Sequence, residues 1–354
     1  MNIKSLLLGS AAALAVVSGA QAADAIVAAE PEPVEYVRVC DAYGTGYFYI
    51  PGTETCLKIE GYIRFQVDVA KDKSDHGFPG PGGFPEGTSD WDAFTRGQVQ
   101  FTAKSDTEYG PLTGVIVLQH NADAANSGYQ NSILDSAYID IAGFRAGLFY
   151  SWWDDGLSGE TDVLATHETL HNSIRYQYES GDFYAGISVD ELEDGHFPDD
   201  GSENPNNVGV ALGLGGKAGA FTYQVIGGYD TDNEEGAIRA MGTVAIGPGT
   251  LGLAAVWASG QNSYYDASEW TIAAEYAIQA TDKLKLTPGA QYFFNYNEDD
   301  GASTDFSNDD AWKVGLTVDY QITDNFYAKA SVQYLDGDNI DDQTQGYFRL
   351  QRAF

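Results

Sequence analysis

The chain has 354 residues, with 52 Asp and Glu against 18 Lys and Arg, which gives a formal net charge of −34. This balance argues against nucleic acid as a partner, because binding phosphates requires a basic surface. Aromatic residues make up 13% of the chain, including 23 Tyr, and this argues against intrinsic disorder.

Residues 1–22 have the three parts of a secretory signal peptide. Lys4 supplies a short positive region, residues 6–17 are mostly apolar, and Ala20-Gln21-Ala22 forms an A-x-A cleavage site. The apolar region is too short to span a bilayer as a permanent helix. We therefore expect export, cleavage and a mature chain that begins near Ala23. No later run has 18 apolar residues, so no transmembrane helix is expected.

The next segment, residues 23–56, contains both cysteines of the chain, Cys40 and Cys56. In an exported protein such a pair is expected to be bonded, because disulfides form and persist in oxidising compartments. The alternative is two free, buried thiols. We expect an N-terminal segment that is closed by a disulfide.

From residue 57 onward, apolar and polar residues alternate with a period of two. In LKIEGYIRFQVDV (57–69), one face is mainly Leu, Ile, Phe and Val, and the other carries Lys, Glu, Arg, Gln and Asp. This pattern predicts a strand with one apolar and one polar face. Many such runs have about the length that a tilted strand needs to cross a bilayer. The sixteen candidate strands span 57–70, 95–106, 111–121, 133–142, 143–152, 172–180, 182–190, 207–215, 219–230, 236–247, 249–259, 267–279, 283–297, 309–321, 325–336 and 343–354.

The connections between these strands are expected to alternate strictly between long and short. An outer-membrane barrel has long extracellular loops, tight periplasmic turns and an even number of strands. A soluble β-sandwich has no reason to keep this alternation, and the repeat of about 40 residues that marks a β-propeller is absent from the sequence. The long connections include 71–94, 122–132, 153–171, 191–206 and 298–308, and the short ones include DTEYGP, AG, SGD, GPG and ITD.

Sixteen strands enclose an interior too wide to fill with side chains. The polar face must therefore line water and the apolar face must contact lipid, so residues 57–354 are predicted to form an all-β, sixteen-stranded antiparallel transmembrane barrel. Aromatic residues near strand ends are typical of the girdles at the membrane interfaces, although β-propensity alone explains each one singly. These residues are Trp152, Trp153, Tyr229, Trp257, Tyr296, Trp312 and Tyr334.

The stretch HETLH, from His167 to His171, matches the zinc-peptidase pattern H-E-x-x-H. That site needs a helix that presents both imidazoles on one face, and a third ligand. Glu191 and Glu193 could supply a third ligand by their spacing, but two predicted strands separate them from the motif. We expect no catalysis, no metal and no cofactor. A short helix over about 162–170, capped by Thr161 or Asp162, is expected instead.

The segment PVEYVRVCDAYGTGYFYIPGTETCLKIEGYIRF (33–65) closely resembles the N-terminal signature of the alphaproteobacterial general porins. The strand number, the short turns and the final Phe354 extend this resemblance over the mature chain. The resemblance implies an integral outer-membrane homotrimer for passive diffusion of small hydrophilic solutes and ions. It also implies that the third long loop, 153–171, folds into the lumen as a constriction.

Charges of opposite sign are expected to face each other at this constriction. Such a transverse field orients dipolar water and solutes and disfavours apolar ones. Some arginines could instead pair with wall carboxylates such as Glu60 and Asp68. The acidic residues expected in the loop are Asp154, Asp155, Glu160, Asp162 and Glu168. The basic residues expected on the inward face are Lys58, Arg64, Arg96, Lys104, Arg145, Arg175, Arg239, Lys313 and Arg349.

The outer connections are also acidic, as in NEDDG (297–301) and DGDNIDD (336–342). Solvation is the usual explanation; bridging by divalent cations to the phosphates of lipopolysaccharide, or cation enrichment at the pore mouth, are alternatives. Neither stretch has the pattern of a dedicated calcium loop. The expected function is a general diffusion porin. Its rivals are a sugar- or anion-specific channel on the same barrel, an outer-membrane enzyme and a secreted β-rich binding protein.

Overall fold

The computed structural model describes residues 38–70, 90–122, 131–166, 169–192, 207–296 and 304–354. The expected signal peptide, most of the outer connections 71–94, 122–132 and 191–206, the NEDDG stretch, and His167 and Glu168 lie outside these residues. Residues 39–354 form one compact unit. In the described part of the chain, no helix is long and apolar enough to span a membrane.

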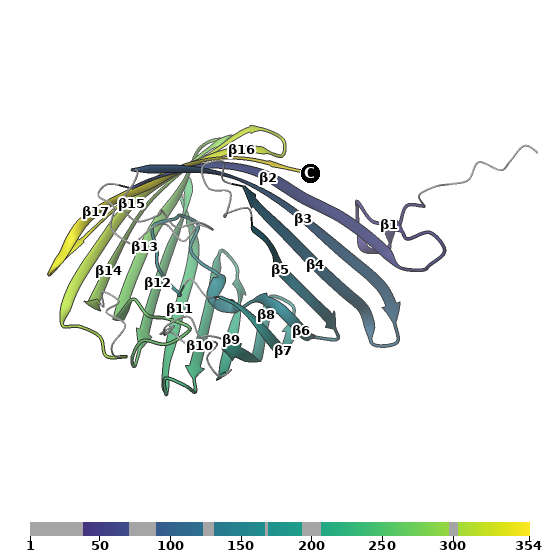
Figure 1. Cartoon of the computed structure of the whole chain (residues 1–354), viewed down its shortest axis with the longest axis horizontal. Helices are drawn as coiled ribbons and strands as arrows, with labels where there is room; N and C mark the ends of the chain where they lie inside the picture. The colour runs from purple at the N-terminus through teal and green to yellow at the C-terminus, as the bar shows by residue number, and fades with distance from the viewer. Residues whose placement is uncertain (1–37, 71–89, 123–130, 167–168, 193–206, 297–303) are drawn as a thin grey trace, which may run out of the picture. The chain divides into compact units, whose positions relative to one another are not determined.

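An antiparallel sheet that closes on itself forms this unit (Figure 1). Its long strands follow one another in chain order from β2 to β17, and β17 pairs with β2, with Leu350 opposite Phe65. All sixteen predicted strands are confirmed, with ends shifted by a few residues. The strands are β2 Cys56–Ala70, β3 Trp91–Thr107, β4 Gly110–Ala122, β5 Asn131–Ile141, β6 Phe144–Tyr150, β7 Leu170–Ser180, β8 Phe183–Leu192, β9 Asn207–Ala218, β10 Phe221–Asp230, β11 Glu235–Ile246, β12 Gly249–Ala258, β13 Ser268–Thr281, β14 Leu284–Tyr296, β15 Asp309–Thr323, β16 Phe326–Gly337 and β17 Ile340–Ala353.

The two ends of the barrel differ in their connections. At one end, called the turn end below, each of the seven turns has two residues: 108–109, 142–143, 181–182, 219–220, 247–248, 282–283 and 324–325. The opposite end is called the loop end below. The expectation of a long connection at each of its positions is wrong for two connections. Residues 231–234 join β10 to β11, and residues 338–339 join β16 to β17. Glu234 and Asn339 have φ of 55° and 56°, and this left-handed backbone lets the chain reverse in a short turn.

Apolar side chains cover the outward face of the barrel. Ile63 and Ile174 are 57% and 65% exposed, whereas inward-facing Gln66 is 4% exposed. On the same outward face near the loop end, Trp257 lies against Trp270 and Trp312 against Tyr334. These pairs suit an interfacial girdle.

Trp152 and Trp153 do not belong to that girdle. They are 5% and 1% exposed and lie in the segment after β6, which folds inside the barrel. Their position near a strand end gave the wrong prediction, because the chain turns inward at that point.

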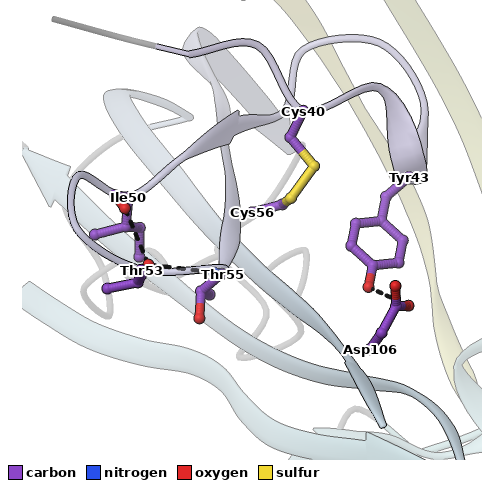
Figure 2. Close-up of a disulfide and its surroundings, with 7 residues drawn as sticks. All are labelled: Cys40, Tyr43, Ile50, Thr53, Thr55, Cys56 and Asp106. Carbon is purple, nitrogen blue, oxygen red and sulfur yellow. Dashed lines mark hydrogen bonds between the residues drawn. A yellow bond between two sulfur atoms is a disulfide. The ribbon is translucent and has the colours of Figure 1, made fainter.

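A small disulfide-bonded unit precedes the first long strand. Cys40 and Cys56 are bonded, with their Cα atoms 5.9 Å apart, which confirms the predicted disulfide (Figure 2). Between them lie the 3-10 helix η2, Asp41–Tyr43, and the short strand β1, Phe48–Tyr49, which pairs with the start of β2. The Tyr43 hydroxyl donates a hydrogen bond of 2.6 Å to Asp106 on β3 (Figure 2), so the unit is tied to the turn end of the barrel.

We predict that replacing both cysteines by serine loosens this unit and leaves the barrel intact. The crosslink is worth about 3 kcal/mol in the chain-entropy model for a loop of this length, while the closed sheet does not depend on it. Limited proteolysis should cut the variant within residues 38–56 faster than the parent, and heat-modifiable gel migration should be unchanged. Two free thiols in protein from the outer membrane, found by mass spectrometry, would contradict the assignment.

Candidate functional site

The connection between β6 and β7, residues 151–169, enters the barrel and is called the inner loop below (in Figure 1 it is the teal segment between β6 and β7). It opens with the 3-10 helix η4, Trp152–Asp154, which is capped by the Ser151 hydroxyl accepting a hydrogen bond from the amide of Trp153. A backbone hydrogen bond of 2.7 Å from Ser151 N to Thr169 O joins the two ends of the loop. The helix expected over 162–170 is wrong: residues 162–166 and 169 are not helical, and β7 begins at Leu170.

Arg239, on β11, holds the base of the inner loop. Its guanidinium donates to the carbonyl oxygens of Trp152 at 2.8 Å, Trp153 at 3.0 Å and Leu164 at 3.3 Å, and to Gln224 at 2.9 Å. Arg239 is only 1% exposed. Because the three carbonyls belong to both limbs of the loop, one buried cation fixes their separation.

Side chains of β13 to β15 then bind the backbone of the loop as it crosses the barrel. Glu275 accepts hydrogen bonds from the amides of Ser158 and Gly159. Gln291 both donates to and accepts from the backbone of Val163, at 2.8 and 2.7 Å. Within the predicted helix, Gln291 thus takes the Val163 carbonyl that a helix would use for the amide four residues further on.

The far tip of the loop reaches β15 and β16. The amide of Glu160 donates to the Thr317 hydroxyl at 3.0 Å, and its carbonyl accepts from Gln333. The Glu160 carboxylate forms an ion pair of 2.6 Å with Lys329 on β16. The inner loop therefore lies along the inside of the wall from β8, where Trp152 packs against Gly186, to β16, and Glu160 also reaches Tyr347 on β17. Among the described residues, Arg64 on β2 and Arg96 and Gln98 on β3 are partly exposed on the part of the inner face that this loop does not cover.

A second connection, residues 259–267 between β12 and β13, supports the inner loop. Tyr264 is 1% exposed, contacts the Trp153 ring at 5.9 Å, and donates a hydrogen bond of 2.8 Å to Asp190. Thr166 of the inner loop donates to the Ser263 carbonyl at 2.9 Å. The sequence reading did not single out this connection, because its alternation is broken and nothing in the local pattern marks a loop as buried.

The acidic residues of the inner loop differ in their surroundings. Asp154 and Asp155 are exposed, while each still accepts one hydrogen bond, from Thr169 at 2.7 Å and from Gln224 at 2.6 Å. Glu160 is paired with Lys329. Asp162 turns back to accept the amide of Leu157, and burial raises the pKa of its carboxyl group. Glu168 lies outside the described residues.

The basic residues predicted for the pore wall fall into two groups. Arg175, Arg239 and Lys313 are 6%, 1% and 7% exposed, so the expectation that they line open water is wrong for these three: they lie beneath the inner loop. The others are partly exposed on the inner face of β2, β3, β6 and β17; they are Lys58, Arg64, Arg96, Lys104, Arg145 and Arg349.

Within the exposed group, pairing separates two kinds of cation. Lys58 pairs with Glu60 at 2.7 Å, and Arg145 pairs with Asp140 at 2.8 Å, as the alternative reading anticipated for some of these residues. Arg64, Arg96 and Arg349 instead donate their Nε–H to the neutral amides of Gln351, Asn121 and Gln66. Amide partners orient these guanidinium groups without neutralising them, so the three arginines form a positive stripe on the inner face of β17, β2 and β3.

The zinc-peptidase motif has no helix to carry it in the described residues. His171 lies on strand β7, is 7% exposed and contacts the Tyr264 ring. No cluster of three or more His, Cys, Asp or Glu that could hold a metal occurs in the part of the chain that the structure describes.

Comparison with known proteins identifies related chains over the full length. The family model described as the Porin subfamily matches residues 24–350. Outer membrane protein IIIA of Rhizobium leguminosarum bv. viciae is 66% identical over 365 residues, which cover 98% of this chain and 93% of that protein. Porin Omp2b of Brucella suis is 33% identical over 393 residues, with 100% of both chains covered.

Solved structures resemble this chain in fold. A loop-deletion mutant of OmpT, an outer membrane protein of Vibrio cholerae, has a TM-score of 0.63 at 14% identity, covering 85% of this chain and 100% of that chain. The outer membrane channel DcaP of Acinetobacter baumannii has a TM-score of 0.64 at 10% identity, covering 86% of this chain and 99% of that chain.

We predict that Arg239→Gln releases the inner loop. Removing the guanidinium leaves three loop carbonyls without their donor in a buried place, at a cost of about 1–3 kcal/mol for each unpaired group. Single-channel recordings should then show a larger and noisier conductance. Arg352→Gln is the matched control, because Arg352 is exposed at the end of β17. If both variants conducted like the parent, Arg239 would not hold the loop.

Proposed function

This chain belongs to the porin subfamily, and from that membership we propose that its conducting path runs between the inner loop and the positive stripe of Arg64, Arg96 and Arg349. The protein is an integral outer-membrane β-barrel that forms a water-filled diffusion channel, as its family and its porin relatives establish.

The observation that supports this path is the asymmetry of the inner wall. The inner loop binds side chains of β10, β11 and β13 to β16, which supports a water path along the partly exposed inner face of β2 and β3. The exposed carboxylates of Asp154 and Asp155 then lie on one side of the path and the three arginines on the other. Such a field orients polar solutes and raises the cost for apolar ones to enter.

Charge balance supports a modest preference for cations. The chain carries a formal charge of −34, with acidic runs in its outer connections, and this enriches cations at the outer mouth. The arginine stripe opposes this locally. The narrowest part decides the preference, because its wall of low dielectric strengthens the field of nearby charges, whereas charges at the outer rim are screened within about 8 Å at physiological salt.

We predict that Asp154→Asn with Asp155→Asn shifts the reversal potential under a salt gradient toward anions. Asp232→Asn with Glu234→Gln is the matched control, because it removes two exposed carboxylates from the outer connection between β10 and β11. Its smaller shift should vanish at high salt. Equal shifts for the two double variants, or none for the inner pair, would place the constriction elsewhere.

We also propose that the mature protein starts near Ala23 and assembles as a homotrimer in contact with lipopolysaccharide. The A-x-A site supports the first part, and porin family membership supports the second. Native mass spectrometry of protein from outer membranes should give three copies of a chain that lacks residues 1–22. A monomeric mass, or a chain that retains Met1, would contradict the corresponding part.

No chemical step is proposed for the HETLH stretch. The relatives are channels, and His171 lies on a strand, where a second histidine four residues away cannot share the helical face that zinc sites of this kind use. Purified protein should therefore cleave no peptide with or without added zinc. Cleavage that Glu168→Gln abolishes would overturn this view.

A further inference from the structure

A cavity of about 380 Å³ opens inside the barrel at the turn end, below the tip of the inner loop. Strands β13 to β17 and β2 contribute its walls. Five of the 18 Lys and Arg of the chain line it: Arg64, Lys283, Lys285, Lys329 and Arg349. Of the 52 Asp and Glu, Asp282 and Asp319 do so. The cavity is therefore locally positive in a chain that is strongly acidic overall.

The strand register sets the basic residues side by side on the inner face. Lys285 is paired with Asp319, Asp319 with Lys329, and Lys329 with Arg349, across four neighbouring strands. Closer to the turns, a second row pairs Tyr327 with Gln351 and Gln351 with Arg64. The cavity is thus walled by two rows of side chains from a continuous sheet, and rigid sheet positions hold a binding site better than loops do.

The charges within the first row are only partly compensated. Asp319 is shared between Lys285 at 3.1 Å and Lys329 at 3.5 Å, and Lys329 also pairs with Glu160 of the inner loop at 2.6 Å. Lys329 and Arg349 are directly opposite each other. Like charges in direct cross-strand pairs destabilise a sheet. An anion placed between them would reverse that cost.

The side chains also offer the donors that an oxyanion needs. The Nε–H of Arg64 is donated to Gln351 at 2.9 Å and that of Arg349 to Gln66 at 2.6 Å, which fixes the plane of each guanidinium. A guanidinium held in this way can present its terminal nitrogens as a fork to carboxylate or phosphate oxygens, and a lysine adds a mobile point charge. Tyr327 contributes one aromatic wall.

We propose that this cavity is a subsite for small multivalent anions that carry phosphate or carboxylate oxygens. Its volume lies within the range of small-molecule sites, and its several cations favour a multivalent anion over a monovalent one. The proposal rests on the diffusion channel, since the lumen is the route to the cavity. Because the cavity lies at the turn end, which faces the periplasm in outer-membrane barrels, such anions should be retained at the periplasmic mouth.

Planar-bilayer recordings test this proposal, with inorganic phosphate and succinate as probes in a potassium chloride background. Either probe should reduce the open-channel current at lower concentration when added on the turn side than on the loop side, and added chloride should not. Phosphate alone, succinate alone, or both acting would each support the subsite and identify the oxyanions that it takes. A reduction from neither side, or one that extra chloride reproduces, would overturn it.

A pair of charge-matched variants makes the test specific. Lys283→Gln should weaken the block about fivefold, the effect of one solvent-exposed charge at contact distance. Lys217→Gln removes one exposed lysine at the same end of the barrel, on β9, far along the sheet from the cavity. Equal effects of the two variants would refute the subsite.

Calorimetric titration of the folded protein in detergent with the same two anions gives an answer that does not depend on conduction. If the protein conducts ions but binds neither anion, the subsite is refuted and the diffusion channel is not. Binding that Lys283→Gln weakens and Lys217→Gln does not would support the subsite.

Discussion

The interior of this barrel depends on one requirement: each backbone amide and carbonyl of the inner loop must find a partner away from bulk water. The partners are side chains of the opposite wall, chiefly Arg239, Glu275 and Gln291. Where the ring of Trp152 lies against the wall, the strands carry glycine: an added Cβ at Gly213 or Gly186 would approach that ring to 2.7 or 2.9 Å. The path of the loop is therefore set both by polar side chains that bind its backbone and by glycines that leave room for the Trp152 ring.

This requirement divides the basic residues into two roles. A buried cation is tolerated only when hydrogen bonds and opposite charges compensate for the loss of water, and Arg239 meets that condition with four acceptors. Arg64, Arg96 and Arg349 keep amide partners and partial exposure, so their charge remains available to a solute. The same residue type therefore stabilises the loop on one side of the barrel and sets the field on the other.

The barrel itself could be predicted from the sequence because a strand's side-chain period of two is a local property. Runs such as 57–69 reveal both the strand and its lipid-facing side. Counting strands also located the loop that enters the lumen. Its path could not be predicted, since the bonds of Glu160 with Thr317 and Lys329 join residues more than 150 positions apart. The false helix over 162–170, the misplaced Trp152 and Trp153, and the buried Arg175, Arg239 and Lys313 have this common cause. The inward position of Lys329 could have been predicted, because the alternation in FYAKASVQY places it on the same inward face as Gln333.

The accessibility of two inward-facing positions, on β3 and on β15, tests the position of the conducting path most directly. Gln98, on β3, is partly exposed, whereas Thr317, on β15 beneath the inner loop, is fully buried. Single cysteines at these positions can be exposed to a charged methanethiosulfonate reagent during single-channel recording, since the two native cysteines are bonded to each other. Gln98→Cys should react and change the current in discrete steps, and Thr317→Cys should not react. Equal reaction at both positions, or reaction at Thr317→Cys alone, would contradict a conducting path that runs along the inner face of β2 and β3.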